Sequence, residues 1–284
     1  MKKIVLLFCI ILQAHLLLKA QGETQLSKEK EEIKICALNY GDGWYSGSAE
    51  RMAEALHPEL NKVLVTKAAQ GGKMFLQYST VSGLIEMARG KTGFLDEDKR
   101  KESVSILDVE GDIACARINT ARFNDFLQMV KADGKWKIVN VLWTFGPDAQ
   151  QKPAVKDFNF ENEKESIIKT ALDFCEGILN GDTHRISGSA NPEINISQYG
   201  IIPSTGKSFV NKLGLGAMTE LINNKLMVFP SGKGNIEIKA LDSMDGYAFI
   251  KSTTPLIDFY LQMAKMDDKW QVINVLFLRK QVKK

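Results

Sequence analysis

Few side chains of this sequence have the types and spacing that an enzyme site requires. After the first twenty residues only two histidines remain, His57 and His184. Each could act as a general base only where it comes within hydrogen-bond reach of a substrate proton. The two halves of the chain align at one constant shift, which places Asn191 opposite His57 and Glu50 opposite His184. A histidine mechanism present in both halves is therefore excluded.

Four acidic residues are candidate general bases. Asp42 and Glu176 fall at equivalent positions in the first helix expected in each half, and Asp125 and Asp258 lie near the start of an expected strand. A carboxylate inside a cavity can take or give a proton, but most acidic side chains are solvated charges. We therefore predict no catalytic residue, with an enzyme that uses one cavity carboxylate as the alternative.

Metal and phosphate sites gain no support from the spacing of ligating residues. Two histidines and the scattered Cys36, Cys115 and Cys175 form no ligand set. The segment "AAQGGKMF" lacks the spacing of a phosphate-binding loop. We predict no metal and no cofactor. One bridge between Cys36 and Cys115 could form, although the odd number of cysteines favours free buried thiols.

The elements that must position any site are repeated along the chain. "DGKWKIVNVLW" at 133–143 returns as "DDKWQVINVLF" at 267–277, and the same shift aligns Gly43 with Gly177. This period far exceeds the ~20–50 residues of solenoid repeats, so the chain is a duplicated domain. The expected organisation is a signal peptide over 1–22, a first domain over 27–146, a linker over 147–160 and a second domain over 161–280.

Each half begins with an amphipathic helix and ends in antiparallel strands. A short second helix, a strand and a third helix follow the first helix, and a four-stranded meander completes the unit. In the last strand, Trp136, Ile138 and Asn140 are expected on one face, and Val139 and Val141 on the other. Because both faces carry apolar residues, we expect both to be covered.

The order of these elements predicts an α+β fold with helices on one side of a curved, mainly antiparallel sheet. Together with "ALNYGDGWYSGSAERMAEALHPE" and "FNDFLQMVKADGKWKIVNVLW" it resembles the nuclear transport factor 2-like (NTF2-like) fold, within it the bacterial branch described as "putative lumazine-binding". The resemblance covers both repeats. It implies two cone-shaped domains that pair through their sheets as an intramolecular pseudo-dimer. This fold hosts isomerases, dehydratases and binding modules, so it does not determine function.

The resemblance also implies a cavity between helix and sheet, with five candidate ligand-binding residues. Tyr40 and Trp44 lie on the inward face of the first helix, and Phe174 is the counterpart of Tyr40. Asn140 and Asn274 are equivalent amides in the last strand of each unit. A buried amide needs partners, either ligand or protein, and protein partners are favoured. Since Tyr40 and Trp44 become Phe174 and Ile178 in the second half, the first unit is expected to be the more polar and aromatic one if a pocket survives.

The N-terminal segment and the charge balance indicate the compartment. Lys2 and Lys3 precede an apolar run from Ile4 to Leu18, a pattern typical of a secretory signal and short for a membrane span of ~20 residues. Without the three lysines of residues 1–20, 34 basic residues balance 34 acidic ones, which does not favour nucleic acid.

We therefore expect an exported bacterial protein, periplasmic or extracellular, that is not an integral membrane protein. It is expected to bind a small apolar or aromatic molecule, or a protein partner, without catalysis. The alternatives are an isomerase- or dehydratase-like enzyme and a structural protein that docks to an envelope partner.

Overall fold

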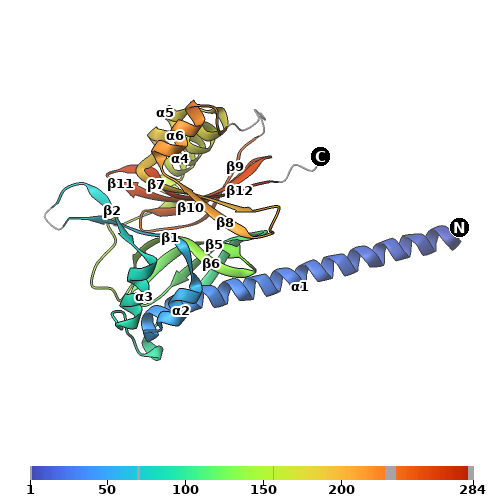
Figure 1. Ribbon diagram of the computed structural model, residues 1–284, viewed down its shortest axis with the longest axis horizontal. Coiled ribbons are helices and arrows are strands. Elements are labelled where there is room, and N and C mark those ends of the chain that lie inside the picture. The colour runs from blue at the N-terminus through green and yellow to red at the C-terminus, as the bar shows by residue number, and fades with distance from the viewer. Residues whose placement is uncertain (1, 69–70, 156, 228–234, 281–284) are drawn as a thin grey trace.

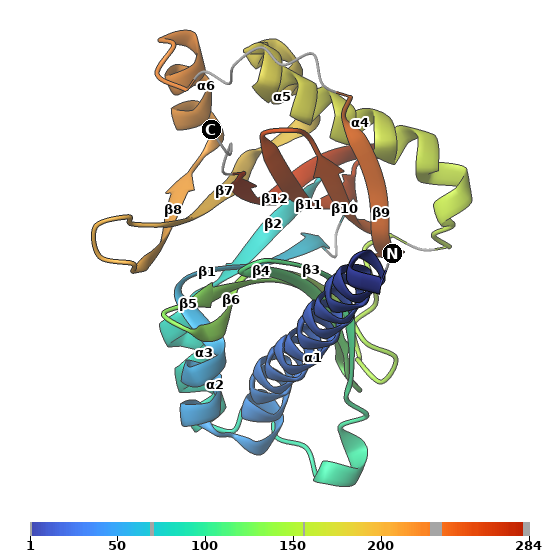
Figure 2. The same cartoon turned by 90° about the vertical axis from the view of Figure 1, so that its right-hand side faces the viewer.

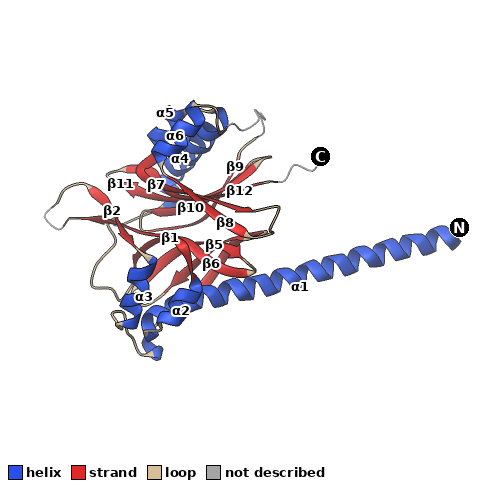
Figure 3. Cartoon of the chain, in the orientation of Figure 1, coloured by secondary structure: helices blue, strands red, loops and turns tan. Residues whose placement is uncertain are grey.

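The computed structural model describes residues 2–68, 71–155, 157–227 and 235–280. Two six-stranded sheets face each other, and the helices of each domain cover the outer face of its sheet (Figures 1 and 3). Figure 2 shows the same four layers from the side, with α1 across one outer face and α4 across the other. The predicted two-domain α+β fold is confirmed.

The first domain contains three helices, one 3-10 turn and six strands. Helix α1 is continuous through Ser27, where a helix start was expected, and it ends before Gly47, whose φ of +76° only glycine adopts readily. The elements are α1 Lys2–Ser46, α2 Ala49–Ala55, β1 Leu56–Lys67, β2 Met74–Ser79, α3 Val81–Arg89, η1 Glu97–Lys99, β3 Ser103–Glu110, β4 Ile113–Asn119, β5 Phe123–Ala132 and β6 Lys135–Phe145.

The second domain repeats these elements at a constant distance along the chain. Apart from the start of the first helix and the 3-10 turn, every element begins and ends at the residues that the shift from Gly43 to Gly177 makes equivalent. The duplication is therefore complete at the level of structure. The elements are α4 Phe160–Asn180, α5 Thr183–Ser189, β7 Ala190–Ile201, β8 Ser208–Leu213, α6 Leu215–Asn223, β9 Glu237–Met244, β10 Tyr247–Thr253, β11 Ile257–Met266 and β12 Lys269–Arg279.

Each sheet has the order of a meander closed by one parallel strand. In the first sheet the order is β2-β1-β6-β5-β4-β3, and β1 runs parallel to β6 while the other neighbours are antiparallel. The edge strands β2 and β8 were not predicted. Each is only six residues long and pairs with a single neighbour, so neither carries the long apolar pattern that identifies a central strand.

A β-bulge in the last strand corrects the predicted alternation of its side chains. The pairing of β5 with β6 shifts register beside Val139, which adds one residue to β6 and reverses the faces beyond it. Trp136 and Ile138 therefore pack under the helices, whereas Val139 and Leu142 pack between the sheets. Uninterrupted alternation would have placed Asn140 on the same face as Trp136 and Ile138. Instead, Asn140 faces the opposite sheet.

The two domains share one core between their sheets. The rings of Phe126 and Phe249 meet there edge to face, with centroids 6.0 Å apart. The Gln128 side-chain nitrogen donates to the Tyr260 carbonyl at 2.8 Å, and Gln262 donates to the Phe126 carbonyl at 2.7 Å. These reciprocal bonds show that the chain forms an intramolecular pseudo-dimer through its sheets.

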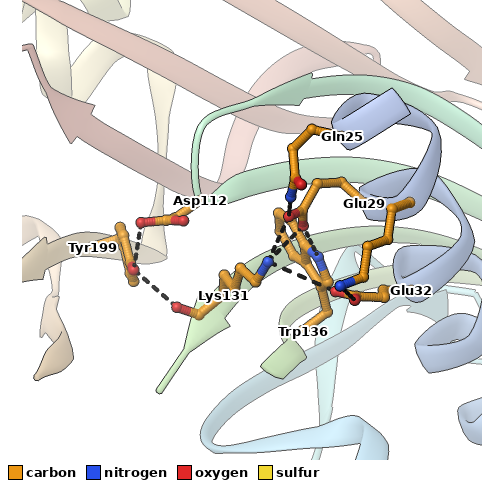
Figure 4. Close-up of polar contacts among 8 residues, drawn as sticks. Gln25, Glu29, Glu32, Asp112, Lys131, Trp136 and Tyr199 are labelled. Atoms are coloured by element: carbon orange, nitrogen blue, oxygen red, sulfur yellow. Dashed lines mark hydrogen bonds and ion pairs between the residues drawn. The ribbon is translucent and has the colours of Figure 1, made fainter. Parts of the chain in front are cut away.

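A polar cluster ties helix α1 to the sheet (Figure 4). The Glu29 carboxylate accepts hydrogen bonds from Lys131 Nζ at 2.6 Å and from Trp136 Nε1 at 2.9 Å. The hydrogen bond from Lys131 is the main reason why the pKa of Glu29 is lowered. Tyr199 of the second domain donates to the Lys131 carbonyl at 2.9 Å, so the same corner joins the domains. The second domain repeats the anchor with Glu163, Lys265 and Trp270.

The cysteines and the helices were each the subject of an expectation from the sequence. Cys36, Cys115 and Cys175 are unpaired and buried. Cys36 packs under the helices and Cys115 between the sheets, so the first sheet separates them. Within the described residues, no helix has both the length and the apolar character to span a bilayer. The expected signal segment, 1–22, falls within α1 except for Met1, which lies outside the described residues.

Candidate functional site

A cavity of about 220 Å³ lies in the first domain between the helices and the outer, helix-covered face of the sheet. Helices α1 and α3 form one side of it, and strands β1, β2, β4, β5 and β6 form the other. Trp44, Phe123 and Trp143 supply aromatic walls, and the Trp143 and Phe123 rings meet at right angles with centroids 5.2 Å apart. The walls of the cavity are therefore largely aromatic and apolar.

Three polar side chains meet at the inner end of this cavity, and we call them the polar triad: Tyr40, Lys62 and Asp125. The Tyr40 hydroxyl donates to Asp125 Oδ2 at 2.5 Å. Lys62 Nζ donates to the Tyr40 oxygen at 2.5 Å and to Asp125 Oδ2 at 3.1 Å. Lys62 is 7% exposed and Asp125 only 2%. The triad thus contains a buried ion pair bridged by a phenol.

Burial and mutual charge set the proton affinities of the triad. Loss of hydration raises the pKa of Tyr40, and the negative charge of Asp125 raises it further. Loss of hydration lowers the pKa of Lys62, and the attraction of Asp125 opposes this shift. Lys62 Nζ also lies 4.7 Å from the Trp143 ring centroid and 5.2 Å from that of Tyr40, where aromatic faces stabilise a cation.

Local periodicity places each member of the triad toward the helices. Tyr40 continues the buried helix face that begins at Ile33. Lys62 alternates along β1 with Val63, which packs between the sheets, and Asp125 alternates in the same way with Phe126. The triad side chains therefore point to the opposite face of the sheet, which lines the cavity.

Glycine at position 93 leaves room for one aromatic wall. A Cβ at Gly93 would lie 1.9 Å from Trp44 Nε1, well inside van der Waals contact. No larger residue therefore fits at this position while Trp44 keeps its place.

The structure brings together only two of the five candidate ligand-binding residues. Tyr40 and Trp44 line the cavity. Phe174 is fully buried in the core of the second domain. Asn140 and Asn274 lie between the sheets, away from the cavity. Asn140 Nδ2 donates to Gln128, while Asn140 Oδ1 accepts from Asn195; Asn274 makes the equivalent bonds with Gln262 and Asn61.

Of the four acids considered as bases, Asp125 lines the cavity. Asp42 and Glu176 both pair with an arginine, in α2 and α5 respectively, and Asp258 pairs with Lys280 at 2.8 Å. Among the described residues, no group of three histidine, cysteine, aspartate or glutamate side chains could hold a metal ion.

Sequence reasoning missed Lys62. The segment around Lys62 indicates only a strand that begins with polar residues. Its partner Asp125 lies 63 residues away in the chain. The one available signal was a comparison of the repeats, because a lysine and an aspartate of the first half are apolar in the second.

The second domain fills the same space with apolar side chains. At the repeat distance, Tyr40, Lys62 and Asp125 correspond to Phe174, Ile196 and Phe259. All three are at most 1% exposed and belong to the core under helices α4 to α6. The fold therefore does not need the polar triad, which exists in the first domain alone.

Three polar atoms of the cavity residues have no protein partner. Asp125 Oδ1, Trp44 Nε1 and Trp143 Nε1 are buried, and no hydrogen bond reaches any of them from the described residues. Leaving a buried donor or acceptor unpaired costs about 1–3 kcal/mol. A ligand with one donor and one acceptor could complete Asp125 Oδ1 and one of the two indole N–H groups.

A second group of charges lies behind the cavity wall, next to Gly41. Asp42 accepts from Arg51 at 2.6 Å and from Arg100 at 2.9 Å. Burial, followed by the charge of Asp42, raises the pKa of Glu102 to about 8. A Cβ at Gly41 would lie 2.7 Å from Glu102 Oε1, so glycine lets Glu102 approach helix α1 beside Asp42.

The raised pKa of Glu102 predicts a pH-dependent stability. The folded chain holds this proton up to about pH 8, whereas the unfolded chain loses it near 4.5. Stability should therefore fall as the pH rises through this window, by about 1–2 kcal/mol after solvent screening. Urea unfolding at several pH values measures this effect. The free energy of unfolding should depend less on pH in Glu102→Gln than in the original chain. The exposed Glu165→Gln is the control, and a Glu102→Gln profile that parallels the original would contradict this assignment.

Comparison with known proteins gives one family match and several similar solved structures. The fold and the site define a two-domain α+β protein with a cavity in its first domain. Residues 28–144, the domain that holds the cavity, match the family model described as "Putative lumazine-binding". No curated protein matches the chain.

Several solved structures are similar to one domain of this chain. An NTF2-like protein of unknown function from Shewanella baltica is 14% identical, with 44% of this chain and 100% of that chain covered and a TM-score of 0.37. An NTF-2-like protein of unknown function from Silicibacter pomeroyi is 18% identical, with 42% and 98% covered and a TM-score of 0.34. A ketosteroid isomerase-like protein from Erwinia carotovora atroseptica is 14% identical, with 43% and 100% covered and a TM-score of 0.33.

Proposed function

We propose that the first domain binds a small, flat heteroaromatic molecule in its cavity and that the second domain is a scaffold. The observation that carries this proposal is the polar triad at the inner end of an aromatic-walled cavity, together with its replacement by Phe174, Ile196 and Phe259 in the second domain. The buried ion pair is present in one of the two copies and absent from the other. Because the fold forms without it in the second domain, its presence in the first domain supports a function there.

The size and chemistry of the cavity favour one or two fused rings. Its volume of about 220 Å³ is below the ~300–1,000 Å³ of sites for drug-sized ligands. The unpaired Asp125 Oδ1 can accept from a ring N–H, and the unpaired Trp143 Nε1 can donate to a carbonyl or ring nitrogen. Lumazine, the compound in the description of the matching family, has both kinds of group on two fused rings.

Fluorescence titration of the full chain with lumazine tests the proposal. The indoles of Trp44 and Trp143 line the cavity, so binding should quench their emission and saturate. Asp125→Asn should weaken the Kd at least ~10-fold, because a charged hydrogen-bond partner contributes ~1.5–3 kcal/mol. Asp258→Asn is the matched control, since Asp258 is equally buried on β11 but pairs with Lys280 outside the cavity. It should leave the Kd unchanged.

Native mass spectrometry of gently purified protein extends this test to unknown ligands. A retained heteroaromatic compound would support the proposal and identify the ligand class. The absence of saturable quenching together with a mass equal to the bare chain would contradict it, as would equal losses in Asp125→Asn and Asp258→Asn.

We also propose that the chain is exported and that residues 1–22 act as its signal. The basic start and the apolar run support this. Cleavage after Ala20 or Gly22 would remove neither Glu29 nor the face of α1 that packs on the sheet. Terminal peptide mass spectrometry of the protein from a bacterial host should find Gln21 or Glu23 as the first residue. An intact Met1 in the cytoplasmic fraction would contradict export.

A further inference from the structure

Lys62 has the surroundings of a reactive amine rather than those of a surface charge. Its Nζ is buried, lines the cavity and lies between the Trp143 and Tyr40 rings, at 4.7 Å and 5.2 Å from their centroids. A lysine becomes nucleophilic when a hydrophobic pocket desolvates its amine. The cavity walls supply this condition, and burial lowers the pKa of Lys62.

The partners of Lys62 can move the protons that a carbonyl addition requires. Tyr40 Oη lies 2.5 Å from Lys62 Nζ and also 2.5 Å from Asp125 Oδ2. Asp125 Oδ2 itself lies 3.1 Å from Nζ. A proton can therefore leave the ammonium group for the carboxylate either directly or through the phenol.

The second domain shows that this arrangement is not a packing requirement. Ile196 takes the place of Lys62, and two phenylalanines take the places of its partners in a filled core. A buried ion pair is seldom more stable than apolar residues of similar volume. Retention of the amine, the phenol and the carboxylate together in the copy with a cavity therefore points to chemistry in that cavity.

We propose that Lys62 captures small aryl or conjugated aldehydes as a protonated Schiff base. This inference rests on the proposed function, because it assigns a ligand class to the same cavity. It makes the first domain a covalent, reversible carrier or sensor of aromatic aldehydes.

The steps balance in protons and atoms. Asp125 takes one proton from the Lys62 ammonium, and the free amine attacks the aldehyde carbon while the carbonyl oxygen gains a proton from Tyr40 or Asp125. The nitrogen of the resulting carbinolamine gives a proton to Asp125, the hydroxyl takes that proton and leaves as water, and the C=N bond forms. Overall, R–CHO and Lys–NH₃⁺ give Lys–NH⁺=CHR and H₂O, with the positive charge kept. The Asp125 carboxylate and the Trp143 face then stabilise the iminium ion.

Reductive trapping on the full chain tests this step. The protein is treated with equimolar benzaldehyde and cyanoborohydride near neutral pH, where exposed lysines of pKa ~10.4 remain almost entirely protonated. Intact mass and peptide mapping should show one benzyl group, on Lys62, formed at least ~10-fold faster than on any other lysine.

The chain supplies a matched control lysine. Lys251 Nζ lies 2.8 Å from Asp108, which accepts from the Tyr260 hydroxyl at 2.6 Å. The same three chemical groups therefore meet there, but outside the cavity. Lys251 should label no faster than exposed lysines.

A single substitution of Lys62 could unfold the chain, because it leaves Asp125 buried without its partner. A variant that replaces the whole triad by apolar side chains avoids this problem. Tyr40→Phe with Lys62→Met and Asp125→Leu replaces the polar triad by apolar side chains, and it should lose the rapid adduct while staying folded. Labelling of Lys62 no faster than Lys251 would overturn the inference. If lumazine still quenched fluorescence in that case, the proposed function would stand without the covalent step. The loss of both signals would overturn both.

Discussion

Lys62→Met should lower the free energy of unfolding by about 3–5 kcal/mol, since breaking a buried ion pair leaves the partner charge uncompensated. Asp125 is 2% exposed and would keep only the Tyr40 hydroxyl as a donor among the described residues. Urea unfolding measures the effect. Lys131→Met is the matched control, because Lys131 is also ion-paired, with Glu29 at 2.6 Å, but its side chain is 20% exposed. We expect it to cost about 1 kcal/mol or less.

The triple variant Tyr40→Phe, Lys62→Met and Asp125→Leu should recover that loss. Replacing a whole buried ion pair by apolar residues is often neutral or stabilising by about 1–4 kcal/mol, and the second domain already demonstrates the apolar arrangement at these positions. The same variant should no longer bind lumazine. If it were as unstable as Lys62→Met alone, the triad would be a structural requirement of the first domain, and its presence there would no longer indicate a dedicated binding site.

Asn140→Asp should destabilise the contact between the two sheets by about 3 kcal/mol or more near neutral pH. Asn140 Nδ2 donates to Gln128 Oε1 at 2.7 Å. Gln128 cannot reverse its amide without losing the 2.8 Å bond that its nitrogen donates to the Tyr260 carbonyl. A carboxylate at position 140 would therefore be fully buried and would face the acceptor oxygen Gln128 Oε1. The carboxylate oxygen at that position would have no hydrogen-bond donor.

The penalty of Asn140→Asp should depend on pH. A protonated aspartic acid can donate to Gln128 as the amide does, whereas the carboxylate cannot. This hydrogen bond and burial both raise the pKa of the new acid in the folded state. The deficit relative to the original chain should be small below pH ~4, where the acid is protonated in both states, and should grow as the pH rises. Paired urea titrations at acidic and neutral pH measure this difference.

Two controls accompany this experiment. Asn162→Asp, at an exposed position in the first turn of α4, should change stability by no more than about 0.5 kcal/mol. Asn274→Asp should reproduce the Asn140→Asp loss, because it makes the equivalent bond to Gln262 at 2.8 Å. A stability of Asn140→Asp within that margin at neutral pH would show that the amide network does not hold the sheets together.

Features that depend on neighbours in the chain were predictable. The helical spacing of Ile33, Ala37 and Tyr40 predicts a buried face, and all three side chains are buried. The repeat predicts that the second domain copies the first, and the expectation that the first unit is the more polar and aromatic one follows from the loss of Tyr40 and Trp44 in the second. Each of these inferences uses periodicity or self-similarity, which the order of residues expresses directly.

Features that depend on distant contacts were not predictable. The ion pair between Lys62 and Asp125 joins residues 63 positions apart on strands that are not neighbours in the sheet. The bulge beside Val139 moved Asn140 from the expected helix side to the opposite sheet, where its partner Asn195 belongs to the other domain. Neither partner could be chosen from local pattern, because pairing register and domain docking depend on the whole fold.

The sequence by itself determined the class of fold, its duplication and which copy is the more polar and aromatic, because amphipathic spacing and a constant shift between the two halves are properties of the chain order. Only the tertiary structure decided which polar groups meet. A side chain gains a chemical role from the groups within hydrogen-bond reach of it, and for Lys62, Asp125 and Asn140 those groups come from other strands.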